Sequence, residues 1–131
     1  MVTNETDEIE RIVMEYVSGV VDFDFQRAEN AWHKDGLKIT FDKERNELVT
    51  ETIIETRPDL SPDQIELIKS KISQKSNIES VDRTGNAANV KLVWLSERDG
   101  NIHEYTDYIL LLNLENEWKI VAKVSDVRKV D

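Results

Sequence analysis

The sequence contains no cysteine, so disulfides and thiolate chemistry are excluded and the fold does not depend on an oxidising compartment. It also contains no apolar stretch as long as a membrane span. The first eight residues are polar and acidic, without the basic and apolar regions of a signal peptide. We therefore expect a cytoplasmic protein that has no membrane partner.

Positive charge is scarce, since 17 lysine and arginine residues stand against 27 aspartate and glutamate residues, for a net charge of −10. Nucleic-acid phosphates require a basic face, so this balance argues against a nucleic-acid partner. The excess acidic charge is explained by solubility alone. The sequence also lacks a glycine-rich phosphate loop and a Gly-x-Ser-x-Gly nucleophile turn.

Metal-ligand spacing is absent as well. His33 and His103 are the only histidines, and neither has a partner at the spacing of a zinc motif. His103 lies four residues before Asp107, roughly 13 Å along a strand, so the two cannot bind one ion together. We expect neither a metal site nor a cofactor.

The chain has the length of one domain, and we assign residues 1–131 to it. Apolar residues at three- and four-residue spacing predict a first helix over residues 9–21, in which Gly19 suggests fraying near the end. Asp24 is the predicted N-cap of a short second helix that carries Trp32 inward and ends at residues 34–36. Ser61 and Gln64 form a capping box that starts a third helix.

The remaining segments predict strands. Residues 37–42 alternate apolar and polar side chains, and residues 47–55 are rich in β-branched ones. The last third reads as four strands joined at Gly85-Asn86, Asp99-Gly100 and Glu115-Asn116. Two-residue loops at these joints would place Leu92 opposite Asp107, and Val124 on the other side of Asp107.

This register separates two faces of the predicted sheet. The inner face contains Val90, Leu92, Trp94, Tyr105, Ile109, Leu111, Trp118, Ile120, Ala122 and Val124. The outer face contains Lys91, Val93, Leu95, Thr106, Tyr108, Leu110, Leu112, Lys119, Val121 and Lys123. Because the outer face is more apolar than solvation requires, we expect a homodimer interface, although lysine stems could cover it in a monomer. The interface residues would be Val93, Leu95, Tyr108, Leu110, Leu112 and Val121.

Asp107 is the one acidic residue of the predicted inner face between apolar neighbours. A carboxylate there must find a hydrogen-bonding partner or hold its proton, and this makes Asp107 the candidate catalytic residue. The alternative is a structural role, in which a helix residue or a water molecule satisfies the Asp107 carboxylate. Glu79 would fall in the same cross-strand row, at an edge where solvation is expected. Aromatic side chains around Asp107 describe an apolar cleft of the kind that binds small molecules, although each one alone is explained by core filling. The predicted ligand pocket comprises Tyr16, Trp32, His33, Leu92, Trp94, Tyr105, Asp107 and Ile109.

The order of elements resembles the nuclear transport factor 2-like superfamily, and within it the group labelled putative lumazine-binding, close to polyketide cyclases of the SnoaL type. The resemblance is carried by residues 16–19, Asp24 and residues 32–35, and best by residues 105–112 and 118–124. It implies an α+β fold in which a cone-shaped, curved antiparallel sheet packs about three helices on its concave face. In related isomerases and cyclases an inner-face aspartate on a late strand does acid-base work, and Asp107 occupies a similar place.

Three functions remain open from the sequence. The first is a non-catalytic domain that binds a small apolar or aromatic molecule. The second is an isomerase, cyclase or dehydratase that uses Asp107 as general acid or base, with Tyr16 or Tyr105 as hydrogen-bond donor. The third is a dimeric interaction module whose pocket is filled by its own side chains. An enzyme needs a second polar group near Asp107, the binding domain needs an open cavity, and the interaction module needs a closed one.

Overall fold

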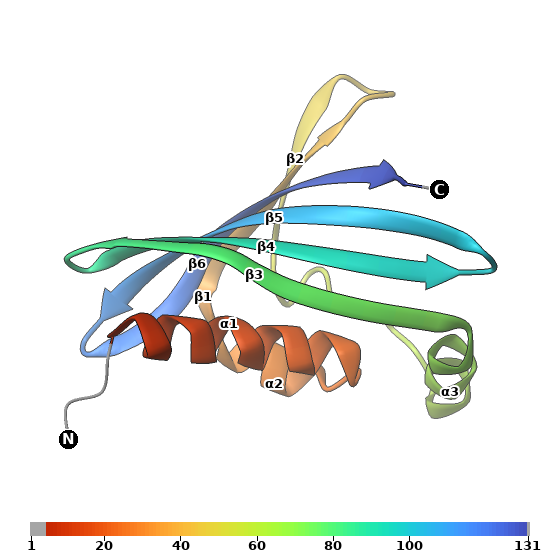
Figure 1. The fold of residues 1–131 in the computed structure, drawn as a ribbon, viewed down its shortest axis with the longest axis horizontal. Coiled ribbons are helices and arrows are strands. Elements are labelled where there is room, and N and C mark those ends of the chain that lie inside the picture. The colour runs from red at the N-terminus through yellow and green to blue at the C-terminus, as the bar shows by residue number, and fades with distance from the viewer. Residues whose placement is uncertain (1–4, 131) are drawn as a thin grey trace.

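The fold combines three helices with one six-stranded sheet, seen in a computed structural model that describes residues 5–130 (Figure 1). Residues 1–4 and 131, the ends of the predicted domain, lie outside this range. The elements are α1 (Glu5–Val21), α2 (Phe25–Asn30), β1 (Trp32–Asp42), β2 (Glu47–Thr52), α3 (Pro62–Lys71), β3 (Ile72–Thr84), β4 (Ala87–Arg98), β5 (Asn101–Leu114) and β6 (Glu117–Lys129).

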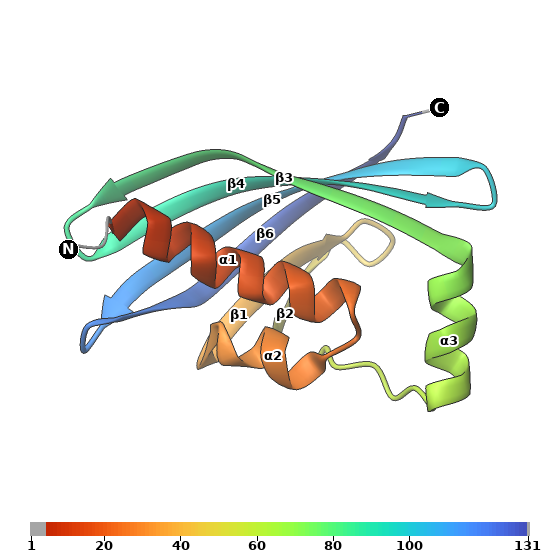
Figure 2. The same ribbon diagram turned by 60° about the horizontal axis from the view of Figure 1, so that its bottom comes forward.

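The sheet is curved and is covered on one face by α1 and α2 (Figures 1 and 2). Its strand order is β2-β1-β6-β5-β4-β3, and every neighbouring pair is antiparallel except β1 with β6. The predicted α+β class, the three helices and the curved sheet are confirmed, but the sheet is mixed rather than wholly antiparallel, and two helices rather than three cover its face (Figure 2). Helix α3 stands apart at the start of β3, and none of its residues is buried (Figure 2).

Helices α1 and α2 pack closely because of a glycine. A Cβ atom on Gly19 would lie 2.5 Å from the backbone nitrogen of Ala28 and 2.8 Å from its Cα atom, a distance that only glycine permits. The expectation that Gly19 frays the end of α1 is therefore wrong, because this buried residue is the contact point between the two helices. The core beneath them is formed by α1 side chains and the inner face of the sheet, including Ile9, Val13, Val90, Leu92, Ile109, Leu111 and Ile120.

Both predicted N-caps are present. The side chain of Asp24 accepts from the backbone N–H of Arg27 at 3.2 Å, and Ser61 and Gln64 form the full capping box of α3. The end of α2 was predicted too late, since the helix stops at Asn30 and Trp32 and His33 belong to β1. The cause is tertiary, because the carbonyl of Ala31 accepts a hydrogen bond from the backbone N–H of Ile120 in β6 at 2.9 Å.

Two further boundaries differ from the prediction. The strand expected over residues 47–55 ends at Thr52, and Ile53 is buried just after it. The polar residues 73–77, which follow α3, belong to the first part of β3. Glu79 lies in an irregularity of that strand, where Ile78 instead opposes Leu92, and it is exposed as expected.

The hairpin between β4 and β5 has the predicted register. Asp99 and Gly100 both have positive φ, and Leu92 opposes Asp107, with Trp94 opposite Tyr105. Positive φ at consecutive positions is what a tight two-residue hairpin turn requires.

The hairpin between β5 and β6 has the predicted register only next to its turn. Leu111 opposes Ile120 as expected, but Leu110 then opposes Ala122, so Val121 is an extra residue in β6. Such a β-bulge transfers every following side chain to the other face of the strand. The residue opposite Asp107 is consequently Ser125 rather than Val124. Lys123 joins the inner face, and Val124, predicted to be inside, is exposed.

No helix within residues 5–130 combines the length and the apolar character needed to cross a membrane.

Candidate functional site

A pocket of about 400 Å³ lies between the C-terminal part of α1 and the inner face of the sheet. We call it the Asp107 pocket. It is lined by Tyr16, Val20, Thr40, Gln74, Trp94, Ser96, Tyr105, Asp107, Lys123, Ser125 and Val127.

Asp107 is 3% exposed and has hydrogen bonds to both carboxylate oxygens. The indole Nε1 of Trp94 donates to Oδ2 at 2.9 Å, and the hydroxyl of Ser125 donates to Oδ1 at 2.6 Å. Nζ of Lys123 lies 3.7 Å from Oδ2 and completes an ion pair. Of the two possibilities that burial left open for this aspartate, the structure has the partnered one.

Lys123 is held by two elements at once. Its Nζ donates to the Tyr16 hydroxyl at 2.9 Å and lies 5.4 Å from the centre of the Tyr16 ring, while Asp107 faces it from β5. Burial by itself lowers the pKa of this amine, but the interactions with Tyr16 and Asp107 outweigh burial and raise it. The side chain is 15% exposed, so a fixed positive charge sits at the wall of an otherwise apolar pocket.

A second lysine stands beside the first. Lys38 of β1 is the cross-strand partner of Lys123 on the same face. Burial, followed by the charge of Lys123, lowers the pKa of Lys38 to about 8, against weaker opposing effects of Asp107 and Glu51. The pKa values of the two neighbouring amines therefore differ, because Lys123 binds the oxygens of Tyr16 and Asp107 and Lys38 does not.

Lys38 also lines a second pocket of about 460 Å³, which we call the helix pocket. Its wall includes Val20, Val21, Asp22, Phe23, Phe25, Ala28, Glu29, Ile53, Thr56, Arg57, Pro58, Lys69, Ile72 and Gln74. Val20 and Gln74 line both pockets, so the two cavities are neighbours.

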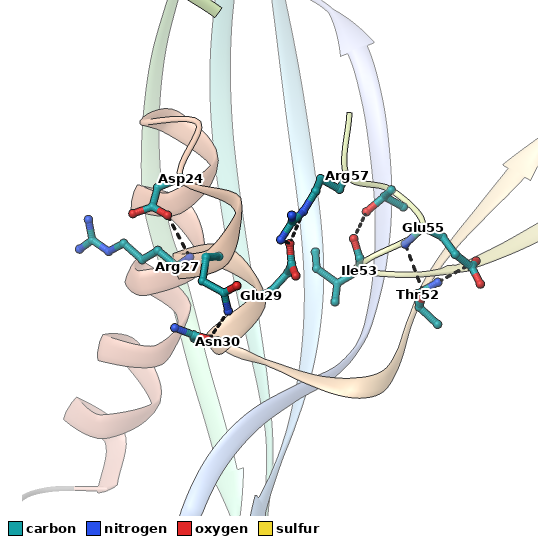
Figure 3. Close-up of polar contacts among 10 residues, drawn as sticks. Asp24, Arg27, Glu29, Asn30, Thr52, Ile53, Glu55 and Arg57 are labelled. Atoms are coloured by element: carbon teal, nitrogen blue, oxygen red, sulfur yellow. Dashed lines mark hydrogen bonds and ion pairs between the residues drawn. The ribbon is translucent and has the colours of Figure 1, made fainter. Parts of the chain in front are cut away.

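Polar contacts hold one wall of the helix pocket together (Figure 3). Arg57, in the connection between β2 and α3, forms an ion pair with Glu29 of α2. In the same connection the hydroxyl of Thr56 donates to the carbonyl of Ile53 at 2.9 Å. These contacts hold the connection between β2 and α3 against α2, so this part of the pocket wall is fixed in position.

The predicted pocket residues divide into two groups. Tyr16, Trp94, Tyr105 and Asp107 come together around the Asp107 pocket. The others do not line it. Trp32, Leu92 and Ile109 are buried in the core, and Trp32 packs edge-on against Tyr16 with ring centres 5.7 Å apart.

His33 was expected at the pocket mouth, but it lies on β1 outside both pockets. Its Nδ1 accepts from the backbone N–H of Asp35 at 3.0 Å. Within residues 5–130 no three His, Asp or Glu side chains are grouped closely enough to hold a metal ion.

Sequence reasoning missed Lys38, Lys123 and Ser125. Counting alternate residues from the turn assigns Lys123 to the outer face, whereas the structure has it on the inner one. Only knowledge of the bulge at Val121 would have reversed that assignment.

Comparison with known proteins places the sequence in a family and the fold among solved structures. The family described as "Putative lumazine-binding" matches residues 4–125. No curated protein matches the sequence. A protein of unknown function from Shewanella baltica, described as nuclear transport factor 2-like, has a TM-score of 0.71 at 20% identity, covering 98% of both chains.

Two other similar structures have names that suggest an activity for those proteins. A ketosteroid isomerase-like protein from Erwinia carotovora atroseptica has a TM-score of 0.67 at 14% identity, covering 99% of each chain. A "Putative Scytalone Dehydratase" from Novosphingobium aromaticivorans has a TM-score of 0.64 at 19% identity, covering 97% of this chain and 85% of that one. At these identities the likeness establishes a shared nuclear transport factor 2-like fold.

The Asp107–Lys123 pair can be tested by a double-mutant cycle. Asp107→Asn and Lys123→Met should each lower the free energy of unfolding by about 3 kcal/mol, because each leaves a buried charge without its partner. The double variant should lose less than the sum of the two, by more than about 1 kcal/mol, since it leaves neither charge behind. Urea unfolding at neutral pH measures all four proteins. Losses that add to within about 0.5 kcal/mol would show that the pair is not coupled.

Proposed function

The chain belongs to the family described as "Putative lumazine-binding", and from that premise we propose that its Asp107 pocket binds a small, mainly apolar or aromatic molecule without transforming it. The supporting observation is the arrangement of polar groups in that pocket. A carboxylate that accepts and an ammonium that donates lie 3.7 Å apart, among Trp94, Tyr105 and aliphatic side chains. A few fixed polar groups in an apolar cavity are typical of small-molecule sites.

The polar groups also indicate what the ligand has to present. Asp107 and the Tyr16 hydroxyl can accept hydrogen bonds, and Lys123 can donate to a carbonyl or ring nitrogen. Trp94 and Tyr105 offer aromatic surfaces beside them. A flat heteroaromatic ring with adjacent donors and acceptors suits this set, and lumazine, which the family description names, is such a ring.

Catalysis is the second candidate, and one observation favours it. An isomerase, cyclase or dehydratase needs a second polar group near Asp107, and Lys123 meets this requirement. Trp94, Ser125 and Lys123 nevertheless already face the Asp107 carboxylate, which leaves about one of its roughly four lone-pair positions for a ligand or a substrate proton. This geometry supports binding over acid-base chemistry. The third candidate, an interaction module with a filled pocket, is disfavoured by a cavity of about 400 Å³.

We also propose that two copies of the chain associate through the outer face of the sheet. The bulge in β6 makes this face more apolar than the sequence suggested, because Val124 replaces Lys123 there. Val124 is the cross-strand neighbour of Tyr108, and the two side chains are 48% and 47% exposed. Leu110, also 47% exposed, lies beside Ala122, which in turn neighbours Leu37 of β1.

Five of the six predicted interface residues alternate along β4 and β5 on this face, which supports the proposal, and the sixth, Val121, is the extra residue of the bulge in β6. Leu95, Tyr108, Leu110 and Leu112 are exposed, and Val93 and Val121 are half-buried. A contiguous apolar surface of this kind on neighbouring strands favours burial against a second copy, whose matching face has the same chemistry.

Ligand binding is tested by NMR titration of the three indole N–H groups with lumazine and a panel of flat heteroaromatic compounds. A bound compound should shift the Trp94 resonance, because Trp94 lines the pocket, and should leave the core residues Trp32 and Trp118 nearly unchanged. Ser96→Phe fills the pocket and should weaken binding about tenfold or more, a loss of about 1.4 kcal/mol. Ser73→Phe, on the outer side of β3, is the matched control. The proposal fails if no compound shifts Trp94, or if Ser96→Phe and Ser73→Phe bind equally well.

The dimer is tested by light scattering at micromolar concentration. The wild-type chain should show twice the mass of one chain, and Leu110→Asp should show the mass of one, because an unpaired charge buried in an interface is costly. Leu67→Asp, at another exposed leucine, on α3, should remain dimeric. A wild-type protein that stays monomeric across this range excludes the interface.

A further inference from the structure

Lys38 is an amine that the proposed function does not use. It lies on the inner face of β1 and lines the helix pocket. Its Nζ is 5.8 Å from the centre of the Tyr16 ring and 5.9 Å from that of Trp32. Among residues 5–130 no carboxylate forms an ion pair with it, and Nζ has no hydrogen bond there.

The carboxylates that line the pockets around Lys38 are paired with other cations, and its cross-strand neighbour Glu51 forms no ion pair with it within residues 5–130. Asp107 and the Tyr16 hydroxyl both bind Lys123, the neighbour of Lys38 across the β1–β6 pair. In the helix pocket, Glu29 is bound to Arg57, and Asp22 lies 3.8 Å from Arg27. Lys38 is therefore left in partly desolvated surroundings with a cation beside it.

These surroundings favour the neutral, nucleophilic form of the amine. Burial is the largest influence and the positive charge of Lys123 the next; together they lower the pKa of Lys38 to about 8. The groups that face it are Tyr16 from α1, Lys123 from β6, Asp107 from β5 and Glu51 from β2, and the two carboxylates act in the opposite direction. At pH 7 roughly one amine in ten is then unprotonated, compared with roughly one in several thousand for an ordinary lysine.

We propose that Lys38 is a reactive amine that forms a reversible imine with a small aldehyde or ketone bound in the helix pocket. The apolar wall of this pocket, which includes Val20, Phe23, Phe25 and Ile53, suits a carbonyl compound with an aromatic or aliphatic body. Desolvated lysines next to a second cationic group are a known route to amine nucleophiles.

The reaction requires no co-reactant. The lone pair of Nζ forms a bond to the carbonyl carbon, and the carbonyl oxygen takes up a proton to give a carbinolamine. That hydroxyl then leaves as water, while nitrogen loses its remaining protons and forms the C=N bond. In total, the amine and the carbonyl compound give an imine and one molecule of water, with no change in oxidation state.

The test is reductive labelling with benzaldehyde and cyanoborohydride at pH 7, in which the reductant traps the imine as a stable secondary amine. Peptide mass spectrometry then gives the labelling rate at each lysine. Lys38 should be labelled at least roughly tenfold faster than Lys69, which lines the same pocket, and than Lys91 on the outer face. The Lys38 rate should rise through a pH of about 8 and level off above it, because the amine is then fully unprotonated. A rate within about twofold of Lys69, or a rate that keeps rising well above that pH, overturns the proposal.

Two variants make the test specific to this neighbourhood. Lys123→Met removes the adjacent cation and leaves Asp107 nearby, which raises the pKa of Lys38 and should slow its labelling at pH 7 roughly threefold or more. Asp107→Asn removes an attractive charge and should accelerate the labelling by a similar factor. Circular dichroism confirms that each variant is folded before it is labelled. Unchanged rates in both folded variants would mean that the reactivity does not arise from these charges, and the proposal would be wrong.

Lys38→Arg keeps the positive charge and should abolish only the label at position 38. The labelling of Lys38 is read by mass spectrometry, whereas ligand binding in the Asp107 pocket is read at Trp94. Failure of one inference is therefore distinguishable from failure of the other.

Discussion

The contact between Lys123 and Asp107 is the interaction on which the inner site depends. It exists because one extra residue, Val121, interrupts the pairing of β5 with β6 and turns Lys123 toward the helices. Without that bulge the neighbour of Asp107 would be an apolar valine, and a buried carboxylate would lack its cation. The same displacement sends Val124 to the outer face, so one irregularity makes the inner face more polar and the outer face more apolar.

A buried ion pair is costly to form, and here the cost is reduced by additional partners. Asp107 also accepts from Trp94 and Ser125, and Lys123 also donates to Tyr16. A network in which each charged group has several partners is what makes such burial tolerable. The balance at Lys38 is the reverse, because burial and the charge of Lys123 outweigh the attraction of Asp107 and Glu51 and lower the pKa of this amine.

Much of the fold was accessible from the sequence because local signals dominated. The turn at Asp99-Gly100 demands positive φ, which set the β4–β5 register along its whole length. Prediction from local sequence patterns failed where contacts between distant parts of the chain determine the structure. Trp32 belongs to β1 because Ala31 bonds to Ile120, far along the chain, and no helix-ending residue signals that contact. The site divides in the same way: Asp107 and Trp94 follow from alternation, whereas Lys38, Lys123 and Ser125 depend on the bulge and on the parallel pairing of β1 with β6.

The direction in which Lys123 points is the central claim, and nuclear Overhauser contacts measure it directly. The structure predicts contacts between the Lys123 side chain and the Tyr16 ring, and between Val124 and Tyr108 on the opposite face. The unbulged register predicts that the Val124 methyl groups contact the Asp107 side chain directly across on β5, with Lys123 exposed to solvent. Observation of that second set of contacts would contradict the bulge, the Asp107–Lys123 pair and the account of both lysines.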